Sequence, residues 1–292
     1  MIFQGSAPAL ITPFKGGKVD FAALEKLIEF QIEGGSDALV MCGTTGEPST
    51  MTLAEEEQVA KAAIAQVAGR VPVIVGIGGN ATQEVLDAAA LMTAAGADAL
   101  LAVTPYYNKT TQAGLIAHYS VVAESTPLPI IVYNVPGRTG LNINPSTVVE
   151  LAEVPNIVAI KEASGNLDQI MELARVARGR IDIYSGNDDQ VFPLVALGAK
   201  GVISVAANLL PRQMHNIATW TLEGDYERAR NLQLDLLPLI NALFMEVSPI
   251  PAKAALEMMG MIDGELRLPL VPMSEPGKAV LRERLLELDL LP

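Results

Sequence analysis

Short apolar runs alternate along the chain with longer stretches whose apolar residues recur at helical spacing. Apolar runs rich in β-branched residues predict buried strands. Alternation of such strands with crossover helices over eight units predicts a (β/α)8 TIM barrel, an α/β fold. We therefore expect residues 1–224 to form a barrel that carries the active site. The eight runs are Ala7–Ile11, Ala38–Cys42, Val73–Ile77, Ala99–Val103, Ile130–Tyr133, Ile157–Ile160, Ile181–Ser185 and Gly201–Val205.

Helix boundaries agree with this alternation. Asp20 precedes an apolar pattern of helical period and suits an N-cap, and Thr52 with Glu55 forms a capping-box pattern. Thr82 is expected to precede a further helix that runs to Gly96. After Gly224 the alternation stops, and residues 225–243, 251–261 and 276–288 predict helices without strands between them. We interpret residues 225–292 as a small C-terminal helical appendage.

Composition narrows the functional classes. Of 292 residues, 50% are hydrophobic but only 4% aromatic, and the net charge is −13. An acidic chain without a basic patch argues against nucleic acid as a partner. The single cysteine, Cys42, allows no intrachain disulfide and fits a reducing compartment. The sequence indicates neither a signal peptide nor a membrane span, so we expect a cytoplasmic protein.

Lys161 is the leading candidate for catalysis. It follows the apolar run Ile157–Ile160, so it lies where a parallel barrel opens. An ammonium near apolar walls is poorly hydrated, which lowers its pKa and yields neutral amine. Neutral amine attacks carbonyls to form Schiff bases. The position by itself also fits a solvated lysine or an ion-pair partner for Glu162.

Other strand ends carry polar residues of their own. After the second predicted strand, Gly43–Glu47 offers hydroxyls and amides that suit a carboxylate, although it also fits a plain turn. After the fourth, Tyr106 and Tyr107 are adjacent, and packing at an interface is their alternative role.

The fifth to eighth predicted strands complete the candidates. Tyr133 ends the strand before that of Lys161, so its phenol can relay protons beside the amine. Arg138 offers a fork for a substrate carboxylate, unless it is only a surface cation. Gly186, after the seventh strand, permits close backbone approach to a ligand, and Ile203 lies in the eighth.

Several cofactor chemistries are disfavoured. The two histidines, His118 and His215, fall in predicted helices away from the strand ends, which argues against a zinc-dependent aldolase. No glycine-rich dinucleotide fingerprint follows a strand, and Gly76–Gly79 lacks a Walker lysine. We expect no metal and no nucleotide cofactor.

Taken together, these motifs resemble a known family. The chain is similar, from about Gly5 to its C-terminus, to the dihydrodipicolinate synthases (4-hydroxy-tetrahydrodipicolinate synthases), which are pyruvate-dependent class I aldolases. The matching motifs are Gly43–Glu47, Pro105–Lys109, Tyr133–Gly140, Lys161–Ser164 and Gly186–Asp188. The resemblance implies a lyase that condenses pyruvate with L-aspartate 4-semialdehyde, in the diaminopimelate and lysine pathway. It also implies a homotetramer, a dimer of tight dimers.

The resemblance also implies residue roles. Lys161 would form the Schiff base, and Tyr133, Thr44 and Tyr107 would form a proton relay, with Tyr107 reaching in from a neighbouring subunit. For the substrates, Thr45 would hold the pyruvate carboxylate and Arg138 that of the semialdehyde. The backbone groups that would line the pyruvate pocket are those of Gly186 and Ile203.

Lysine-inhibited members bind lysine at the tight-dimer interface. Asn80, Glu84 and Tyr106 match that site. Pro48, Leu53 and Glu56 depart from the sensitive pattern, so the resemblance does not decide whether lysine inhibits this chain.

The same residues also fit two rival functions. One keeps the Schiff base but cleaves a 2-keto-3-deoxy sugar acid or sialic acid. The other is a non-catalytic barrel that binds a small acid or a partner protein, which would give no reducible imine. The combination of Lys161, Tyr133 and Arg138 at neighbouring strand ends favours the synthase.

Overall fold

Eight parallel strands form the centre of the computed structural model, which describes residues 1–291. Their order is β1-β10-β9-β8-β7-β6-β5-β4, and a bridge between Ala9 and Val40 brings β1 next to β4. The predicted (β/α)8 barrel is therefore confirmed. The strands are β1 (Gly5–Pro8), β4 (Leu39–Met41), β5 (Val73–Gly76), β6 (Ala99–Val103), β7 (Ile130–Asn134), β8 (Ile157–Glu162), β9 (Asp182–Ser185) and β10 (Gly201–Ser204).

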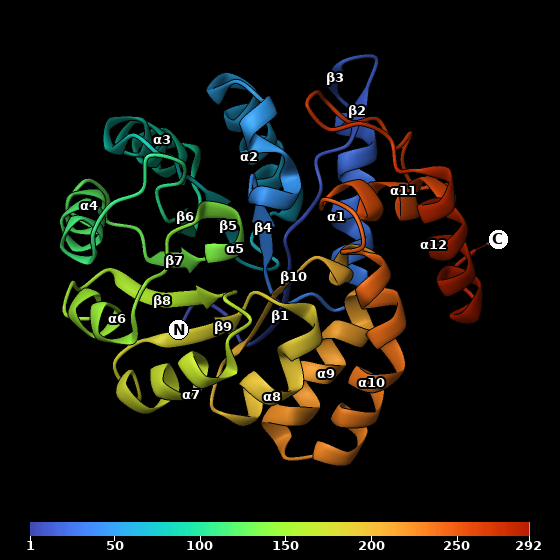
Figure 1. Cartoon of the computed structure of the whole chain (residues 1–292). Coiled ribbons are helices and arrows are strands. Elements are labelled where there is room, and N and C mark those ends of the chain that lie inside the picture. The colour runs from blue at the N-terminus through green and yellow to red at the C-terminus, as the bar shows by residue number, and fades with distance from the viewer. Residues whose placement is uncertain (292) are drawn as a thin grey trace.

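Helices surround this barrel, as Figure 1 shows. Asp20 caps the first helix and Thr52 with Glu55 forms the expected capping box, whereas the N-cap before Thr82 is Ala81. A short hairpin of β2 (Phe14–Lys15) and β3 (Lys18–Val19) was not predicted. The helices of the barrel are α1 (Phe21–Glu33), α2 (Leu53–Val67), α3 (Thr82–Ala95), α4 (Gln112–Glu124), α5 (Pro136–Thr139), α6 (Pro145–Leu151), α7 (Leu167–Val176), α8 (Val191–Ala196) and α9 (Pro211–Glu223).

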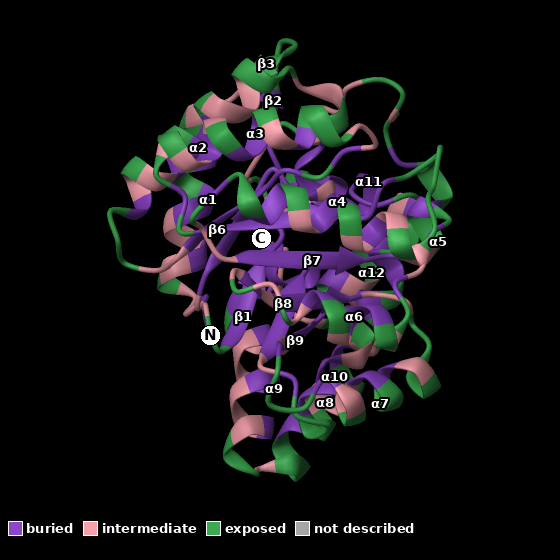
Figure 2. Cartoon of the chain, turned by 90° about the vertical axis from the view of Figure 1, so that its left-hand side faces the viewer, coloured by how far each residue is buried: buried purple, intermediate pink, exposed green. Residues whose placement is uncertain are grey.

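Alternate residues of each strand face opposite sides, which creates two apolar layers. On β7, Ile131 and Tyr133 belong to the inner layer, while Ile130 and Val132 pack outward beneath the helices. On β8, Ala159 faces inward in the same way. The strands are almost wholly buried, and exposed residues lie on outer helix faces and loops (Figure 2).

A β-bulge sets the register between β7 and β8. Ile130 pairs with Ile157, but Ile131 pairs with Ala159, so Val158 is the extra residue. The shift continues to the strand ends, where Tyr133 pairs with Lys161. Bulges re-aim side chains at barrel rims. This one brings the phenol and the amine level with each other.

Three helices follow the barrel: α10 (Tyr226–Ala242), α11 (Ile250–Met258) and α12 (Glu275–Glu287). This agrees with the expected helical segments. Helix α12 packs on α10 and α11 at the edge of the molecule in Figure 1. The loop after α11 reaches the β2–β3 hairpin, where Lys15 pairs with Asp263 at 3.0 Å. Within residues 1–291, none of the helices combines the length and apolarity that crossing a membrane requires.

Candidate active site

Lys161 lies near the end of β8, inside the barrel. Its side chain is only 5% exposed, and its Nζ sits 4.3 Å from the centre of the Tyr133 ring. Burial lowers the pKa of Lys161 to about 7; Asp188 raises it in part, and Arg138 lowers it further. A large fraction of this amine is therefore neutral near pH 7, as a Schiff-base nucleophile requires. Lys161 is not paired with Glu162, whose carboxylate instead accepts hydrogen bonds from Asn134 and the Ser164 backbone.

Tyr133 supplies a protonated phenol beside this amine. Burial raises its pKa to about 12, although Arg138 and a hydrogen bond with the Thr44 side chain act in the opposite direction. The phenol therefore keeps its proton at neutral pH and can both donate and accept. The structure brings Lys161, Tyr133 and Thr44 together from three different strand ends.

Thr44 and Thr45 belong to the 3-10 helix η1 (Thr44–Gly46), which follows β4. A hydrogen bond holds the turn against the segment after β1, because the Thr12 hydroxyl donates to the Gly46 carbonyl at 2.7 Å. Thr45 is buried and Thr44 is half-buried at the mouth. The segment is thus a rigid turn whose hydroxyls and amides can meet a carboxylate.

Arg138 is exposed at the mouth, in the short helix α5 that follows β7. Its Nη2 donates to the Ser248 carbonyl at 3.3 Å. Ser248 lies in the loop before α11, so the C-terminal region contacts Arg138, a candidate substrate-binding residue. Sequence reasoning missed this contact, because the two residues lie far apart in the chain and a backbone carbonyl leaves no sequence signal.

Gly186 borders Lys161 from the end of β9, and Ile203 lies in β10, one strand farther along. A Cβ atom at Gly186 would lie 3.1 Å from the Lys161 Cε and 2.6 Å from the Ala163 Cβ, so the lysine chain passes through space that glycine leaves open. Ile203 is fully buried in the same inner layer as Tyr133. Gly186 therefore lies close enough to shape a pocket around the amine, and Ile203 faces the same barrel interior.

Asp188 is a buried acid near Lys161 to which sequence reasoning gave no role. It is 2% exposed and begins the 3-10 helix η3 (Asp188–Gln190) after β9. Burial raises its pKa, and Lys161 lowers it in part. The sequence offers two adjacent aspartates, Asp188 and Asp189, but it does not reveal that only the first turns inward.

Tyr107 does not join the site of its own chain. Its ring is 90% exposed, and its backbone has a φ of 67°, which is uncommon for a residue with a side chain. The prediction that it reaches a neighbouring subunit stays a prediction.

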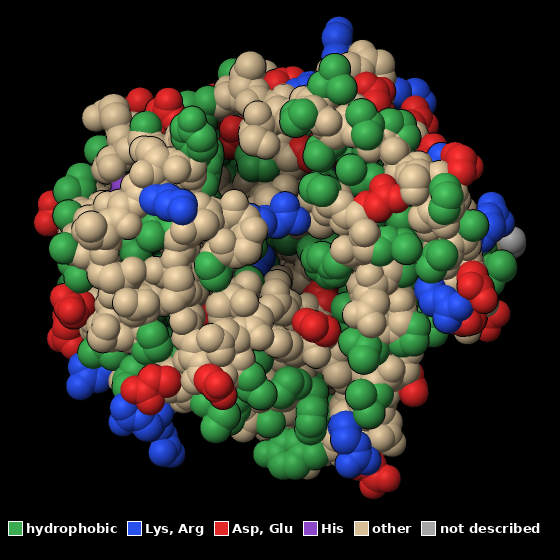
Figure 3. Space-filling model, in the orientation of Figure 1, with side chains coloured by type: hydrophobic (Ala, Val, Ile, Leu, Met, Phe, Trp, Pro, Cys, Tyr) green, Lys and Arg blue, Asp and Glu red, His purple; other side chains and the backbone are tan. Residues whose placement is uncertain are grey.

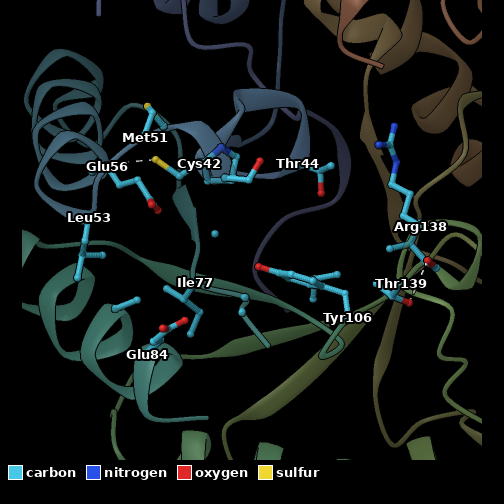
Figure 4. Close-up of a pocket in the computed structure, with 18 of the residues that line it drawn as sticks. Cys42, Thr44, Met51, Leu53, Glu56, Ile77, Glu84, Tyr106, Arg138 and Thr139 are labelled. Atoms are coloured by element: carbon cyan, nitrogen blue, oxygen red, sulfur yellow. Dashed lines mark hydrogen bonds between the residues drawn. The ribbon is translucent and has the colours of Figure 1, made fainter. Parts of the chain in front are cut away.

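A cavity of about 710 Å³ extends from Thr44 and Arg138 towards α2 and α3. Figure 4 shows Glu56 and Glu84 at the end away from Arg138, with Leu53 between helices and Tyr106 nearer the mouth. Burial raises the pKa of Glu56 to about 7. Asn80 lies beside this region, where its carbonyl accepts a hydrogen bond from Asn108. Pro48 also lines the cavity.

The mouth opens on the face shown in Figure 3, where Lys and Arg side chains lie beside a central hollow in an otherwise acidic protein. The two histidines lie elsewhere, as expected. His118 of α4 contacts the Thr82 hydroxyl at 3.0 Å, and His215 of α9 pairs with Asp37 at 2.8 Å.

Comparison with known proteins decides the family. The model of the dihydrodipicolinate synthetase family matches residues 2–287. The chain belongs to this family. A 4-hydroxy-tetrahydrodipicolinate synthase of Caldicellulosiruptor bescii is 52% identical over 287 residues, which cover 98% of this chain and 97% of that protein.

Solved structures of dihydrodipicolinate synthases match equally completely. One from Acinetobacter baumannii, described as chloride-inhibited and complexed with pyruvate, has a TM-score of 0.98 and 44% identity, and covers 100% of both chains. Another, described as a monomeric variant, has a TM-score of 0.98 and 44% identity, and covers 99% of this chain and 98% of its own. The family resemblance inferred from the strand-end motifs is therefore confirmed.

Proposed function

We propose that this chain is a 4-hydroxy-tetrahydrodipicolinate synthase, a lyase that condenses pyruvate with L-aspartate 4-semialdehyde through a Schiff base on Lys161. The family and the names of its full-length relatives support the activity. The observation that carries the mechanism is the buried amine of Lys161, held over the Tyr133 ring with its pKa lowered to about 7.

The proposed reaction begins when the neutral Lys161 amine attacks the pyruvate ketone. Tyr133, linked to Thr44, donates the proton with which the carbinolamine oxygen leaves as water. The Tyr133 phenolate then takes a methyl proton, which converts the iminium into an enamine. The enamine carbon attacks the semialdehyde aldehyde, and the Tyr133 phenol returns the proton to the aldehyde oxygen. The amino group of the second substrate displaces Lys161 by transimination and closes the ring. No metal or nucleotide enters these steps.

Substrate carboxylates are assigned to two sides of the mouth. Thr45 would hold that of pyruvate through its hydroxyl and amide, with backbone groups of Gly186 and Ile203 lining the same pocket. Arg138 would hold that of the semialdehyde, since its guanidinium is exposed at the mouth and steadied by the Ser248 carbonyl.

The assembly is also a proposal. Leu167, Met171 and Leu197, on α7 and after α8, are exposed apolar residues that suit contact between subunits. Tyr107 is exposed with a constrained backbone, as a residue inserted into a neighbour would be. We infer a homotetramer, a dimer of tight dimers, and sedimentation of the unchanged chain tests this assembly. We also infer that the protein is found in the cytoplasm.

The cavity behind the mouth is a proposed site for lysine. Glu84, Tyr106 and the nearby Asn80 would bind it, since the Glu84 carboxylate suits an ammonium group. Inhibition by added lysine that is lost in Glu84→Ala would support this assignment, and unchanged turnover with lysine would contradict it.

The function is tested by supplying pyruvate and aspartate semialdehyde and detecting the product with a downstream reductase. Arg138→Ala is expected to lose condensation by at least about 100-fold, since a charge-assisted bidentate contact is lost, yet still to bind pyruvate covalently. Arg178→Ala, at the opposite end of the barrel, is the matched control. Full condensation by Arg138→Ala, or cleavage of a sugar-derived keto acid instead, would overturn the assignment.

A further inference from the structure

We propose that Asp188 is a positioning residue for the reaction: its buried carboxylate supplies the counter-charge for the cation that forms on Lys161. This inference rests on the proposed function, because the cation in question is the iminium. It concerns a residue that reaches the chemistry only through Lys161.

Asp188 follows β9, whose end pairs with the end of β8. Strands β8 and β9 pair Lys161 with Tyr184, and the Gly186 backbone N–H donates to the Glu162 carbonyl at 2.8 Å. Gly186 itself borders the Lys161 side chain, since a Cβ there would lie 3.1 Å from Cε. Two residues later, Asp188 turns inward and becomes 2% exposed. The turn that carries Asp188 therefore starts against the Lys161 side chain, and the Asp188 carboxylate is buried within it.

Only one of the two Asp188 oxygens has a structural task. Oδ2 accepts from the backbone N–H groups of Val205 at 3.0 Å and Ala206 at 2.8 Å, which fixes the loop after β10. Oδ1 is buried and has no hydrogen-bond partner among the described residues. Holding the loop needs one acceptor oxygen, which asparagine would supply equally well. The Ser204 hydroxyl and the two backbone N–H groups favour the charged form of Asp188, but none of them is a cation. Lys161 is the cation that acts on this carboxylate.

The charged groups that act on Lys161 come from two neighbouring loops. Arg138, after β7, lowers its pKa, and Asp188, after β9, raises it. Tyr133 on β7 is neutral because burial raises its pKa to about 12, and the adjoining residues of β10, Ile203 and Ser204, carry no charge. Asp188 is thus the one negative group among the described residues that opposes Arg138 at this amine.

The opposite effects of Arg138 and Asp188 on Lys161 matter for the proposed reaction. A neutral amine, a ketone and a proton combine to an iminium and water, so a positive charge appears on Nζ. The charge is lost in the neutral enamine and returns when the enamine carbon bonds to the aldehyde. Arg138, required for the second substrate, repels that charge. Asp188 offsets the repulsion, because an anion near a buried cation favours the charged form.

The test compares three variants of the full chain. Asp188→Asn keeps the shape and the acceptor for Val205 and Ala206 but removes the charge. Asp188→Glu keeps the charge, and Asp189→Asn removes the charge of the adjacent exposed residue. Lys161 is labelled with acetic anhydride across a pH series without substrate, and mass spectrometry of its peptide gives the midpoint of labelling.

The unchanged chain is expected to have its midpoint at about 7. Asp188→Asn should lower it by about one pH unit, while Asp189→Asn leaves it in place and Asp188→Glu stays close to the unchanged chain. The pyruvate concentration for half-maximal imine trapping above pH 8 should rise about tenfold in Asp188→Asn, which is one pH unit expressed as an equilibrium constant. A merely structural role would not move the labelling midpoint downward.

An unmoved midpoint in Asp188→Asn would overturn the inference, and so would equal shifts in Asp188→Asn and Asp188→Glu. The labelling experiment involves no pyruvate. If the midpoint shifts but the unchanged chain traps no imine, the proposed function falls while the coupling of the two charges is supported.

Discussion

At the scale of single residues, Lys161 owes its chemistry to its surroundings. The same side chain on the surface would be an ammonium ion with a pKa of about 10.5. Inside the barrel, burial removes much of its hydration, and the Tyr133 ring beneath it offers an aromatic face in place of water. The residue type is ordinary, and its position at the end of β8 makes it a nucleophile.

The pH dependence of pyruvate capture follows from this. Because the pKa of Lys161 in the folded chain is lowered from 10.5 to about 7, the neutral fraction rises through pH 7 and levels off above it. Single-turnover trapping of pyruvate should therefore increase about tenfold between pH 6 and pH 8 and little beyond. A rate that keeps climbing past pH 9 would mean that the reacting amine is a solvated one.

At the scale of elements, strand ends and the turns after them assemble the site. The predicted strands and helices were found because apolar period and capping residues are local signals, as Thr52 and Glu55 illustrate. Lys161, Tyr133 and Arg138 could be selected because parallel strands end at one face.

Other features had no local signal. The bulge at Val158 that levels Tyr133 with Lys161 depends on pairing between strands, and strand sequences do not specify such an offset. The burial of Asp188 rather than Asp189 depends on how the turn after β9 folds against the loop after β10. The contact between Arg138 and the Ser248 carbonyl requires the path of the C-terminal region.

Gly186→Ala tests the close approach of β9 to β8. The added methyl group would meet the Ala163 Cβ at 2.6 Å and the Lys161 Cε at 3.1 Å, so the lysine must move. We expect imine trapping to slow by at least about tenfold, while the variant still folds, because overpacking costs about 1 to 3 kcal/mol. Gly137→Ala, where an added methyl group meets nothing within 4 Å, is the control. Equal trapping rates in both variants would contradict this packing argument.

At the scale of the whole molecule, the C-terminal region braces the barrel from outside. Lys253 of α11 is fully buried and forms an ion pair with Glu47, which directly follows the Thr44–Gly46 turn. Lys253 also donates to the Glu265 carbonyl at 2.9 Å. Two buried charges that satisfy each other link α11 to the loop after β4, so the helical region and the site depend on one another.

Lys253→Met should destabilise the chain by about 3 to 5 kcal/mol, because Glu47 keeps its buried charge without a partner. Adding Glu47→Gln should recover much of this loss, since a buried pair replaced by neutral groups is often nearly neutral in stability. Urea unfolding measures both. The solvent-accessible pair Lys278–Glu275 is the control, and Lys278→Met should leave the free energy of unfolding almost unchanged. Similar losses for Lys253→Met and Lys278→Met would refute the bracing role.

Covalent trapping of pyruvate tests the central claim most directly. The intact protein is incubated with pyruvate and borohydride, digested, and analysed by mass spectrometry. We predict one reduced pyruvate adduct per chain, on the peptide that contains Lys161, and none in Lys161→Ala. An adduct on another lysine, or condensation of the two substrates without any reducible adduct, would contradict the account.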